Sequence, residues 1–133
     1  MSKVGGKKIV PTERQAQRAI VDMAALCFPS VIVHHSPNQN NKRGWGGKIA
    51  AINNRKDGVV TGWPDLLFLW GAGNAAFAEI KRPGRASTVS DAQRSILDRL
   101  MNYGFPTAVL TGPETAYKWL YEIGAPRARE FVP

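Results

Sequence analysis

The sequence lacks several features that mark common classes of protein. It contains a single cysteine, Cys27, among 133 residues, which excludes an internal disulfide and is typical of a reducing compartment. No apolar run approaches the roughly 20 residues that cross a bilayer, and the first residues lack the apolar stretch of a secretory signal. We therefore expect an intracellular, cytoplasmic protein without a membrane segment.

Motifs for several kinds of cofactor and nucleophile chemistry are also absent. The sequence has no P-loop, no dinucleotide-binding fingerprint and no nucleophile elbow. Its two histidines, His34 and His35, are adjacent, and no spacing of Cys and His indicates a zinc site. A histidine pair at the end of a short strand is more often structural than catalytic.

Acidic residues are scarce relative to basic ones. The chain has 10 Asp and Glu against 18 Lys and Arg, a formal net charge of +8 and a sequence pI of about 10.1. A small domain this basic most often binds a polyanion, with nucleic acid the leading candidate. The alternative is charge that serves only solubility.

The length of the chain favours one compact domain with a core of its own. We expect a flexible basic arm at residues 1–10, a single folded domain at 11–124 and a basic tail at 125–133. No internal repeat or low-complexity tract divides the sequence.

The pattern of apolar residues predicts an α/β fold. The expected elements, in order, are a helix (12–28), a strand (31–34), a hairpin (65–81), a helix (90–103), a strand (107–110) and a helix (113–123). The connection at 36–62 is long, polar and basic, and its residues 48–56 suit a short helix closed by Gly58. The order α-β-β-β-α-β-α implies a small mixed sheet flanked by helices, with an antiparallel hairpin and a right-handed parallel crossover to the last strand.

The hairpin carries charged residues at its open end. If residues 71–74 form its loop, Trp70 faces Ala75 and Asp65 lies opposite Ile80. Asp65 then lies beside Glu79 and Lys81, since neighbouring strands are about 4.8 Å apart. A one-residue change of register would move Asp65 from one face of the sheet to the other. The prediction that the charges lie close together is therefore firmer than the prediction of which face Asp65 lies on.

These residue types match a divalent-metal site. Asp65, Glu79 and the backbone carbonyl of Ile80 offer hard oxygen ligands, as Mg²⁺ prefers. Lys81 shares the face of Glu79 and is placed to orient or deprotonate an attacking water, or to stabilise charge on a phosphate. The alternative is a hairpin end closed by a solvated Glu–Lys pair.

Two helix starts add polar residues that point toward the same place. Glu13 lies in line with the apolar stripe of its helix, which favours a site role, although a first-turn acid that stabilises the helix dipole is the commoner case. Gln93 shares the face of Leu97 and Leu100 and also suits a capping box with Ser90, and both roles are compatible.

Basic residues gather in sequence around the hairpin. The candidate phosphate contacts are Lys42, Arg43, Lys48, Arg55, Lys56, Arg82 and Arg85. Two tryptophans suit stacking on a base or packing in the core; packing is favoured for Trp63, and Trp45 is left open.

Taken together, these motifs resemble the VRR-NUC (virus-type replication-repair nuclease) domains of the PD-(D/E)XK nuclease superfamily. The similarity spans residues 11–123. It rests on the acid of the first helix (Glu13), Pro37-Asn38, Lys42-Arg43, Gly62-Trp63-Pro64-Asp65-Leu66, Glu79-x-Lys81 and the Ser90-x-x-Gln93 helix that ends at Gly104.

The resemblance implies a restriction-endonuclease-like core and Mg²⁺- or Mn²⁺-dependent hydrolysis of DNA phosphodiesters. It carries metal binding onto Asp65 and Glu79 with Glu13 assisting, catalysis onto Lys81, and a supporting role onto Gln93. The short stand-alone form is similar to phage-encoded members, some of them homodimers that act on branched DNA such as Holliday junctions or flaps during replication, recombination or repair. This implies a bacterial or phage-infected host cell. Two competing readings are a non-catalytic nucleic-acid-binding module that keeps the fold and a basic structural protein.

Overall fold

The computed structural model describes residues 9–37 and 44–133, and within them it contains four helices and four strands. In chain order these are α1 (Glu13–Cys27), β1 (Ile32–His35), α2 (Gly44–Lys56), β2 (Leu66–Trp70), β3 (Asn74–Ile80), α3 (Asp91–Asn102), β4 (Thr107–Leu110) and α4 (Pro113–Glu122). The predicted α/β class is confirmed. The short helix expected at 48–56 is present as α2, which begins earlier, at Gly44, and β1 begins one residue later than expected.

The four strands form one mixed sheet in the order β1-β2-β3-β4. β1 and β3 both pair with β2 antiparallel, and β3 pairs with β4 parallel, as the hairpin and the crossover predicted. The antiparallel pairing of β1 with β2 was not predicted from the sequence. It brings the end of β1 to the start of β2, where Asp65 lies.

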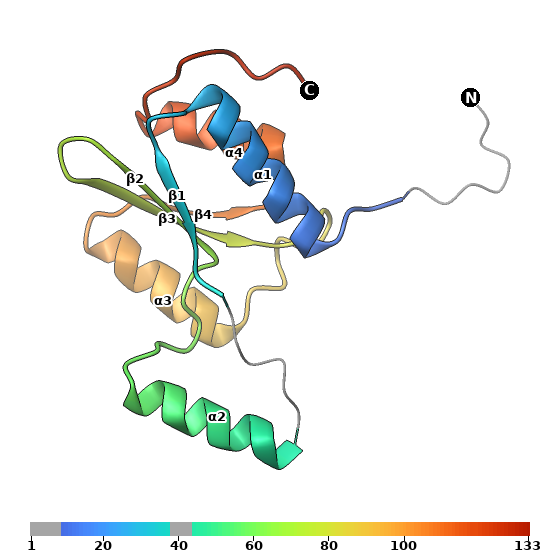
Figure 1. The fold of residues 1–133 in the computed structure, drawn as a ribbon, viewed down its shortest axis with the longest axis vertical. Coiled ribbons are helices and arrows are strands. Elements are labelled where there is room, and N and C mark those ends of the chain that lie inside the picture. The colour runs from blue at the N-terminus through green and yellow to red at the C-terminus, as the bar shows by residue number, and fades with distance from the viewer. Residues whose placement is uncertain (1–8, 38–43) are drawn as a thin grey trace, which may run out of the picture.

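Helices cover both faces of this sheet. α1 and α4 pack on one another and on one face, and α3 packs on the other (Figure 1). The buried core lies under α1 and α4 and includes Ile20, Phe28, Phe68, Ile80 and Leu120. No helix in the described part of the chain is long and apolar enough to cross a membrane.

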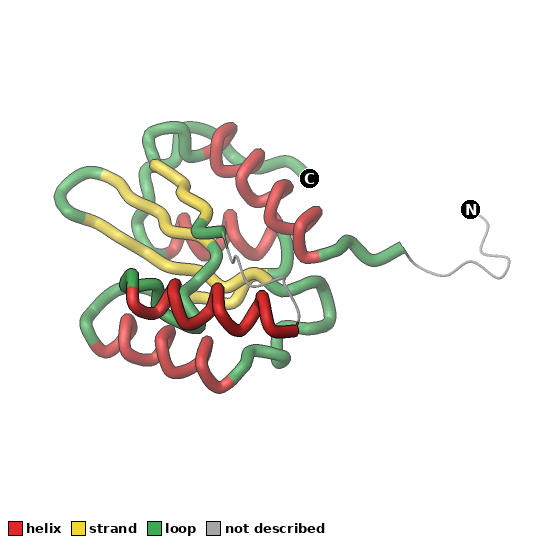
Figure 2. The backbone as a smooth tube through the Cα atoms, turned by 60° about the horizontal axis from the view of Figure 1, so that its bottom comes forward, coloured by secondary structure: helices red, strands yellow, loops and turns green. Residues whose placement is uncertain are grey.

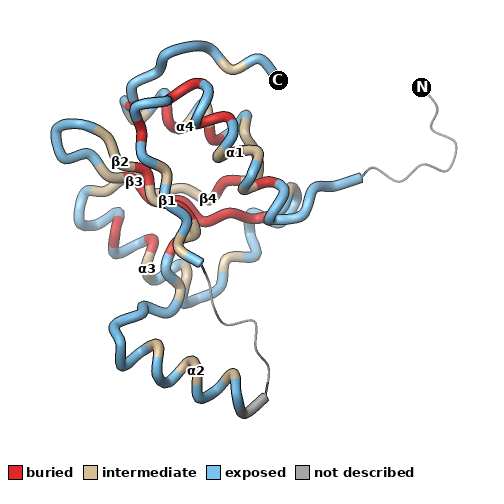
Figure 3. Tube along the Cα trace, in the orientation of Figure 1, coloured by how far each residue is buried: buried red, intermediate tan, exposed pale blue. Residues whose placement is uncertain are grey.

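α2 differs from the other helices in its packing. It lies beyond the sheet beside α3 (Figure 2), and none of its residues from Gly46 to Lys56 is buried (Figure 3). Its last turn carries Arg55 and Lys56. The helix therefore presents basic side chains to solvent instead of burying an apolar face.

The predicted hairpin register is wrong by one residue. Trp70 pairs with Asn74, and Leu66 pairs with Ala78, so the loop holds three residues instead of four. Ala72 and Gly73 have φ values of 67° and 75°, and the Asn74 side chain donates to the Gly71 carbonyl at 2.6 Å. This left-handed pair tightens the turn, and continuing the ladder sets Asp65 opposite Glu79 on the same face of the sheet.

Candidate active site

Asp65 is fixed by groups from β3 and from the end of β1. Its Oδ2 accepts a hydrogen bond from the Ile80 N–H at 2.8 Å. Its carbonyl accepts from the Ser36 N–H at 3.0 Å and lies 3.1 Å from Nδ1 of His35. Because Oδ2 is engaged with β3, the carboxylate is held at the hairpin end, next to Glu79.

Glu79 is the most buried charged residue of the hairpin end, with 2 % of its surface exposed. Its Oε2 accepts a hydrogen bond from Nε2 of Gln93 at 2.7 Å, whereas its buried Oε1 has no hydrogen-bond partner among the described residues. A buried carboxylate oxygen without a donor is costly. A cation or a proton at Oε1 would offset this cost.

The electrostatics of Glu79 reflect this burial. Burial first, and then the charge of the Asp65 carboxylate, raises the pKa of Glu79 from 4.5 to about 8, while Lys81 acts in the opposite direction. Two close carboxylates resist simultaneous ionisation unless a positive charge joins them. At neutral pH this pair is thus poised to gain from a bound cation.

Lys81 follows Glu79 by two residues and lies on the same face of the sheet. It is 9 % exposed, and its N–H donates to the Leu110 carbonyl at 2.9 Å, which extends the β3–β4 ladder. Within residues 9–37 and 44–133 the one ion pair joins Arg94 to Asp98. A hairpin end closed by a direct Glu79–Lys81 pair, the structural alternative, is therefore not what the structure has.

Gln93 performs both of the roles that its position allows. In the capping box of α3, its Oε1 accepts from the Ser90 N–H at 2.9 Å and its N–H donates to the Ser90 hydroxyl at 3.1 Å. Its Nε2 remains free for the bond to Glu79. One side chain thus caps a helix and holds a carboxylate of the site.

Gly62 brings the loop before Asp65 against the first turn of α3. Its φ is 83°, and a Cβ at this position would lie 2.5 Å from the carbonyl carbon of Ala92 and 2.8 Å from the Gln93 nitrogen. Only glycine permits both the backbone conformation and the approach. This contact explains why a glycine precedes Trp63-Pro64-Asp65.

Glu13 lies farther out than the two hairpin acids. It is exposed in the first turn of α1, although its charge contributes to raising the pKa of Glu79. Among the described residues, no three His, Cys, Asp or Glu side chains group closely enough to hold a metal ion by themselves. Asp65 and Glu79 therefore form the inner pair, and Glu13 lies at its edge.

This pair fits a hard divalent cation. Carboxylate and carbonyl oxygens are the ligands that Mg²⁺ and Mn²⁺ prefer, and Mg²⁺ commonly takes only one or two protein carboxylates, with water and phosphate oxygens completing its shell. The unpartnered Oε1 of Glu79 is the specific observation that supports the fit.

The predicted phosphate contacts are spread over three segments. Lys48, Arg55 and Lys56 are exposed on α2, and Arg82 and Arg85 are exposed in the turn directly after Lys81. Lys42 and Arg43, with Asn38, lie outside the described residues, as does the side chain of Trp45. The structure brings Arg55 near the first turn of α3, since both line the same cavity.

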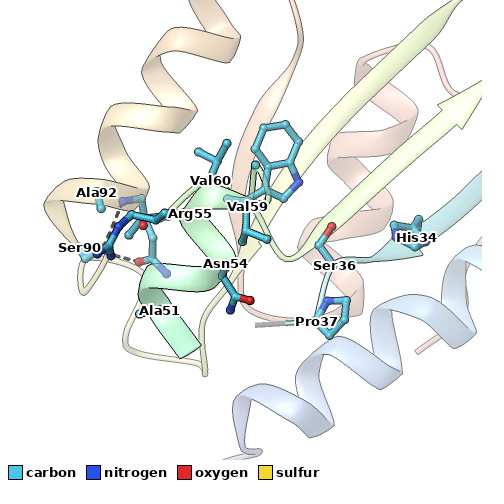
Figure 4. A pocket seen from close by; sticks show the side chains of 15 residues that line it. His34, Ser36, Pro37, Ala51, Asn54, Arg55, Val59, Val60, Ser90 and Ala92 are labelled. Atoms are coloured by element: carbon cyan, nitrogen blue, oxygen red, sulfur yellow. Dashed lines mark hydrogen bonds between the residues drawn. The ribbon is translucent and has the colours of Figure 1, made fainter. Parts of the chain in front are cut away.

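That cavity was missed by sequence reasoning. It has a volume of about 740 Å³ and lies between the end of β1, α2 with the loop that follows it, and the first turn of α3 (Figure 4). Its lining includes Ser36, Asn54, Arg55, Val59, Trp63 and Gln93. The only sequence signal for it is the pair of glycines, Gly58 and Gly62, whose positive φ values shape the intervening loop.

Comparison with known proteins gave one match. A family model described as the VRR-NUC domain matches residues 12–114. No curated protein matches the chain, and no solved structure does. The matched range includes both hairpin acids, Lys81, Glu13 and Gln93, and it ends at the start of α4.

Proposed function

The chain belongs to the VRR-NUC family of nuclease-type domains that act on DNA, and from this premise we propose that it is a Mg²⁺- or Mn²⁺-dependent DNA endonuclease. Its substrate class is branched or structured duplex DNA, such as flaps and four-way junctions. The catalytic group comprises Asp65, Glu79, Lys81 and Gln93.

One observation carries this proposal: Glu79 is buried next to Asp65 with an unpartnered carboxylate oxygen. A domain that only binds DNA gains nothing from two acids facing a phosphate, since like charges repel the ligand. Burial of such a pair is costly unless a cation compensates it. A metal-assisted hydrolase explains that cost.

Asp65 and Glu79 would hold the metal ion, with the Ile80 carbonyl and Glu13 assisting. A divalent ion in this place supplies charge neutralisation at the scissile phosphate and lowers the pKa of a bound water. Asp65 is oriented by the Ile80 N–H, and Gln93 fixes Oε2 of Glu79, so Oε1 would be the oxygen of Glu79 that binds the ion.

Lys81 is the proposed base or electrostatic partner of the attacking water. Its ammonium group is carried on the face of Glu79 by β3 and is largely shielded from solvent. In this setting it can orient the water and stabilise the charge that develops on the phosphate.

The exposed cations supply affinity for the DNA backbone. Arg55 and Lys56 are exposed on α2, and Arg82 and Arg85 are exposed in the turn after β3; these are the proposed contacts. Because such contacts release counterions, binding should weaken steeply as the salt concentration rises. A two-fold homodimer would place two sites in one assembly and suit a four-way junction.

The test is a cleavage assay on duplex, nicked, flap and four-way-junction DNA with Mg²⁺, Mn²⁺ or EDTA. Wild type should cut at least one branched substrate with metal and none with EDTA. Asp65→Asn and Lys81→Ala should remove cleavage, whereas Asp98→Asn and Lys118→Ala, which change the same residue types on other elements, should retain it.

Two results would overturn the proposal in different ways. If wild type cuts nothing with either metal yet binds branched DNA, the protein is a non-catalytic binding module with the nuclease fold. If cleavage persists in both Asp65→Asn and Lys81→Ala, the assignment of the site is wrong.

A further inference from the structure

We propose that the cavity between α2, the loop at 58–63 and the first turn of α3 is a nucleoside pocket that takes one unpaired base of the DNA. The inference deepens the proposed nuclease function and rests on it for the position of the pocket beside the cut. The binding event itself is measurable without cleavage.

The size and lining of the cavity suit a base with its sugar. Its volume of about 740 Å³ lies within the roughly 300–1,000 Å³ range of small-ligand sites. Val59, Val60 and Trp63 supply apolar surface, and Asn54 offers an amide that can donate and accept hydrogen bonds. Aromatic and aliphatic surface combined with a few polar groups is the chemistry that recognises a nucleobase.

Trp63 is held in a fixed position at the cavity. Its ring packs edge-to-face on Phe77 with centroids 5.6 Å apart, as its predicted packing role requires. It nevertheless remains 38 % exposed and lines the cavity. An anchored and partly exposed indole offers contact surface to a base at little entropic cost.

The cavity adjoins the proposed active site through shared residues. Gln93 lines it and also donates to Glu79. Ser36 lines it and also donates its N–H to the Asp65 carbonyl. A nucleoside bound here would therefore contact residues that are hydrogen-bonded to Glu79 and to Asp65.

The charge of the lining favours a nucleotide over a cation. Among the residues that the structure describes, no Asp or Glu lines the cavity, whereas Arg55 and His34 do. Figure 4 shows Arg55 on α2 directed toward Ser90 and Ala92 at the start of α3, and Asn54 nearer to Ser36 and Pro37. Arg55 is placed to contact a phosphate while the apolar surface receives the base.

An unpaired base fits this cavity better than intact duplex does. A paired duplex presents backbone and base edges, which need charge but no concave apolar surface. A base can enter only after it leaves the stack, and this is least costly where the base is already unpaired, as at a flap, bulge or junction. The pocket would thus select structured DNA.

The first experiment measures binding of wild type in EDTA to 25-mer duplexes that carry one bulged 2-aminopurine, the same 2-aminopurine paired, or a bulged abasic residue. The bulged base should bind about tenfold more tightly than the abasic residue, since a stacked base contributes about 1–3 kcal/mol. Its fluorescence should change on binding. Equal affinities, or no fluorescence change, would overturn the pocket and leave simple backbone binding.

Two variants locate the effect in the cavity. Ala51→Phe should fill it and remove the tenfold preference, and Asn54→Ala should reduce the preference several-fold; both should leave affinity for the paired duplex within about twofold. The controls are Ala50→Phe and Asn53→Ala, the neighbouring residues of the same types, which do not line the cavity. If Ala51→Phe unfolds, Asn54→Ala carries the test. Persistence of the preference in the folded cavity variants would overturn the proposal.

The two proposals fail separately. A protein that prefers the bulged base but cuts no DNA keeps the pocket and loses the nuclease function. A protein that cuts DNA with metal but shows no base preference keeps the function and loses the pocket.

Discussion

α1 and α3 begin with the same kind of capping box, yet only one of the two capping glutamines contacts the site. Both carry a complete capping box, Thr12 with Gln15 and Ser90 with Gln93. Gln15 is exposed and, within the described part of the chain, hydrogen-bonds only to its own cap residue Thr12, whereas Nε2 of Gln93 also donates to Glu79. The capping box fixes the backbone of the glutamine. Whether its side-chain amide also binds a carboxylate depends on the strand that lies next to the helix.

The largest effect should come from removing the charge of Glu79, the carboxylate that Gln93 contacts and Gln15 does not. Glu79→Gln keeps the shape of the side chain but removes its charge, so the metal loses a ligand. We expect cleavage to fall by about 10³-fold or more, consistent with the several kcal/mol that a metal supplies to such transition states. The measurement is single-turnover cleavage of a four-way junction at saturating Mg²⁺. Activity within tenfold of wild type would contradict the role of Glu79.

The next effect separates the two glutamines directly. Gln93→Ala should lower cleavage by about 10–100-fold, the usual cost of losing a group that orients a metal ligand, and should raise the Mg²⁺ concentration needed for half-maximal rate. Gln15→Ala removes the equivalent capping partner from α1 and should leave cleavage within about twofold, since only a cap is lost. Gln93→Glu, which keeps the cap acceptor but adds a third negative charge, should be no better than Gln93→Ala.

Equal losses in Gln15→Ala and Gln93→Ala would show that only helix stability matters. A loss confined to Gln93→Ala, with an unchanged Mg²⁺ requirement, would place Gln93 on the DNA instead of on Glu79.

A smaller effect concerns pH and stability without metal. The pKa of Glu79 is about 8 in the folded protein against 4.5 as its ordinary value, so the native state binds the extra proton between these values. The contribution of Glu79 to stability is therefore most favourable below about pH 4.5, is lost as the pH rises toward 8, and is then constant. Thermal unfolding in EDTA should show this decline, and Glu79→Gln should flatten it.

Mg²⁺ provides the matching control for the pH profile. Since the ion needs the ionised carboxylate, it should raise the Tm of wild type more at pH 8 than at pH 5 and should have little effect on Glu79→Gln. A wild-type profile parallel to that of Glu79→Gln would show that burial of this acid is not coupled to folding.

The smallest effect tests the shared device itself. Ser90→Ala and Thr12→Ala each remove one N-cap hydroxyl and should each cost about 1 kcal/mol of unfolding free energy. Urea unfolding of the two variants should give similar losses. A markedly larger loss for Ser90→Ala would mean that the cap of α3 also supports the packing of Gln93 on Glu79.

Local patterns predicted much of the fold and much of the site. Apolar periodicity and cap residues predicted α1, α3 and β4, and the hairpin pattern predicted that Asp65 lies close to Glu79 and Lys81. The predicted hairpin register was wrong because the turn depends on Ala72 at positive φ. Alanine rarely adopts this conformation, so the sequence does not indicate it.

Features that join distant segments were beyond the sequence. The pairing of β1 with β2 depends on contacts across more than 30 residues, as in His35 with Leu66, and no local rule selects it. The cavity is formed by three segments that are distant in the sequence, so local patterns could not predict it. Gln93 was ambiguous for a related reason, because the capping box that predicted its backbone gave no information about the strand that faces its amide.

The contact of Gly62 with α3 has a mechanical consequence. With no side chain between them, the loop at 62–65 and the first turn of α3 are in direct backbone contact, so no compressible layer absorbs a displacement of either segment. A push on the loop is passed to Ala92 and Gln93, and through the amide to Glu79. Because this contact is stiff, the orientation of the Glu79 carboxylate depends on the position of the segment that carries Trp63 and Asp65.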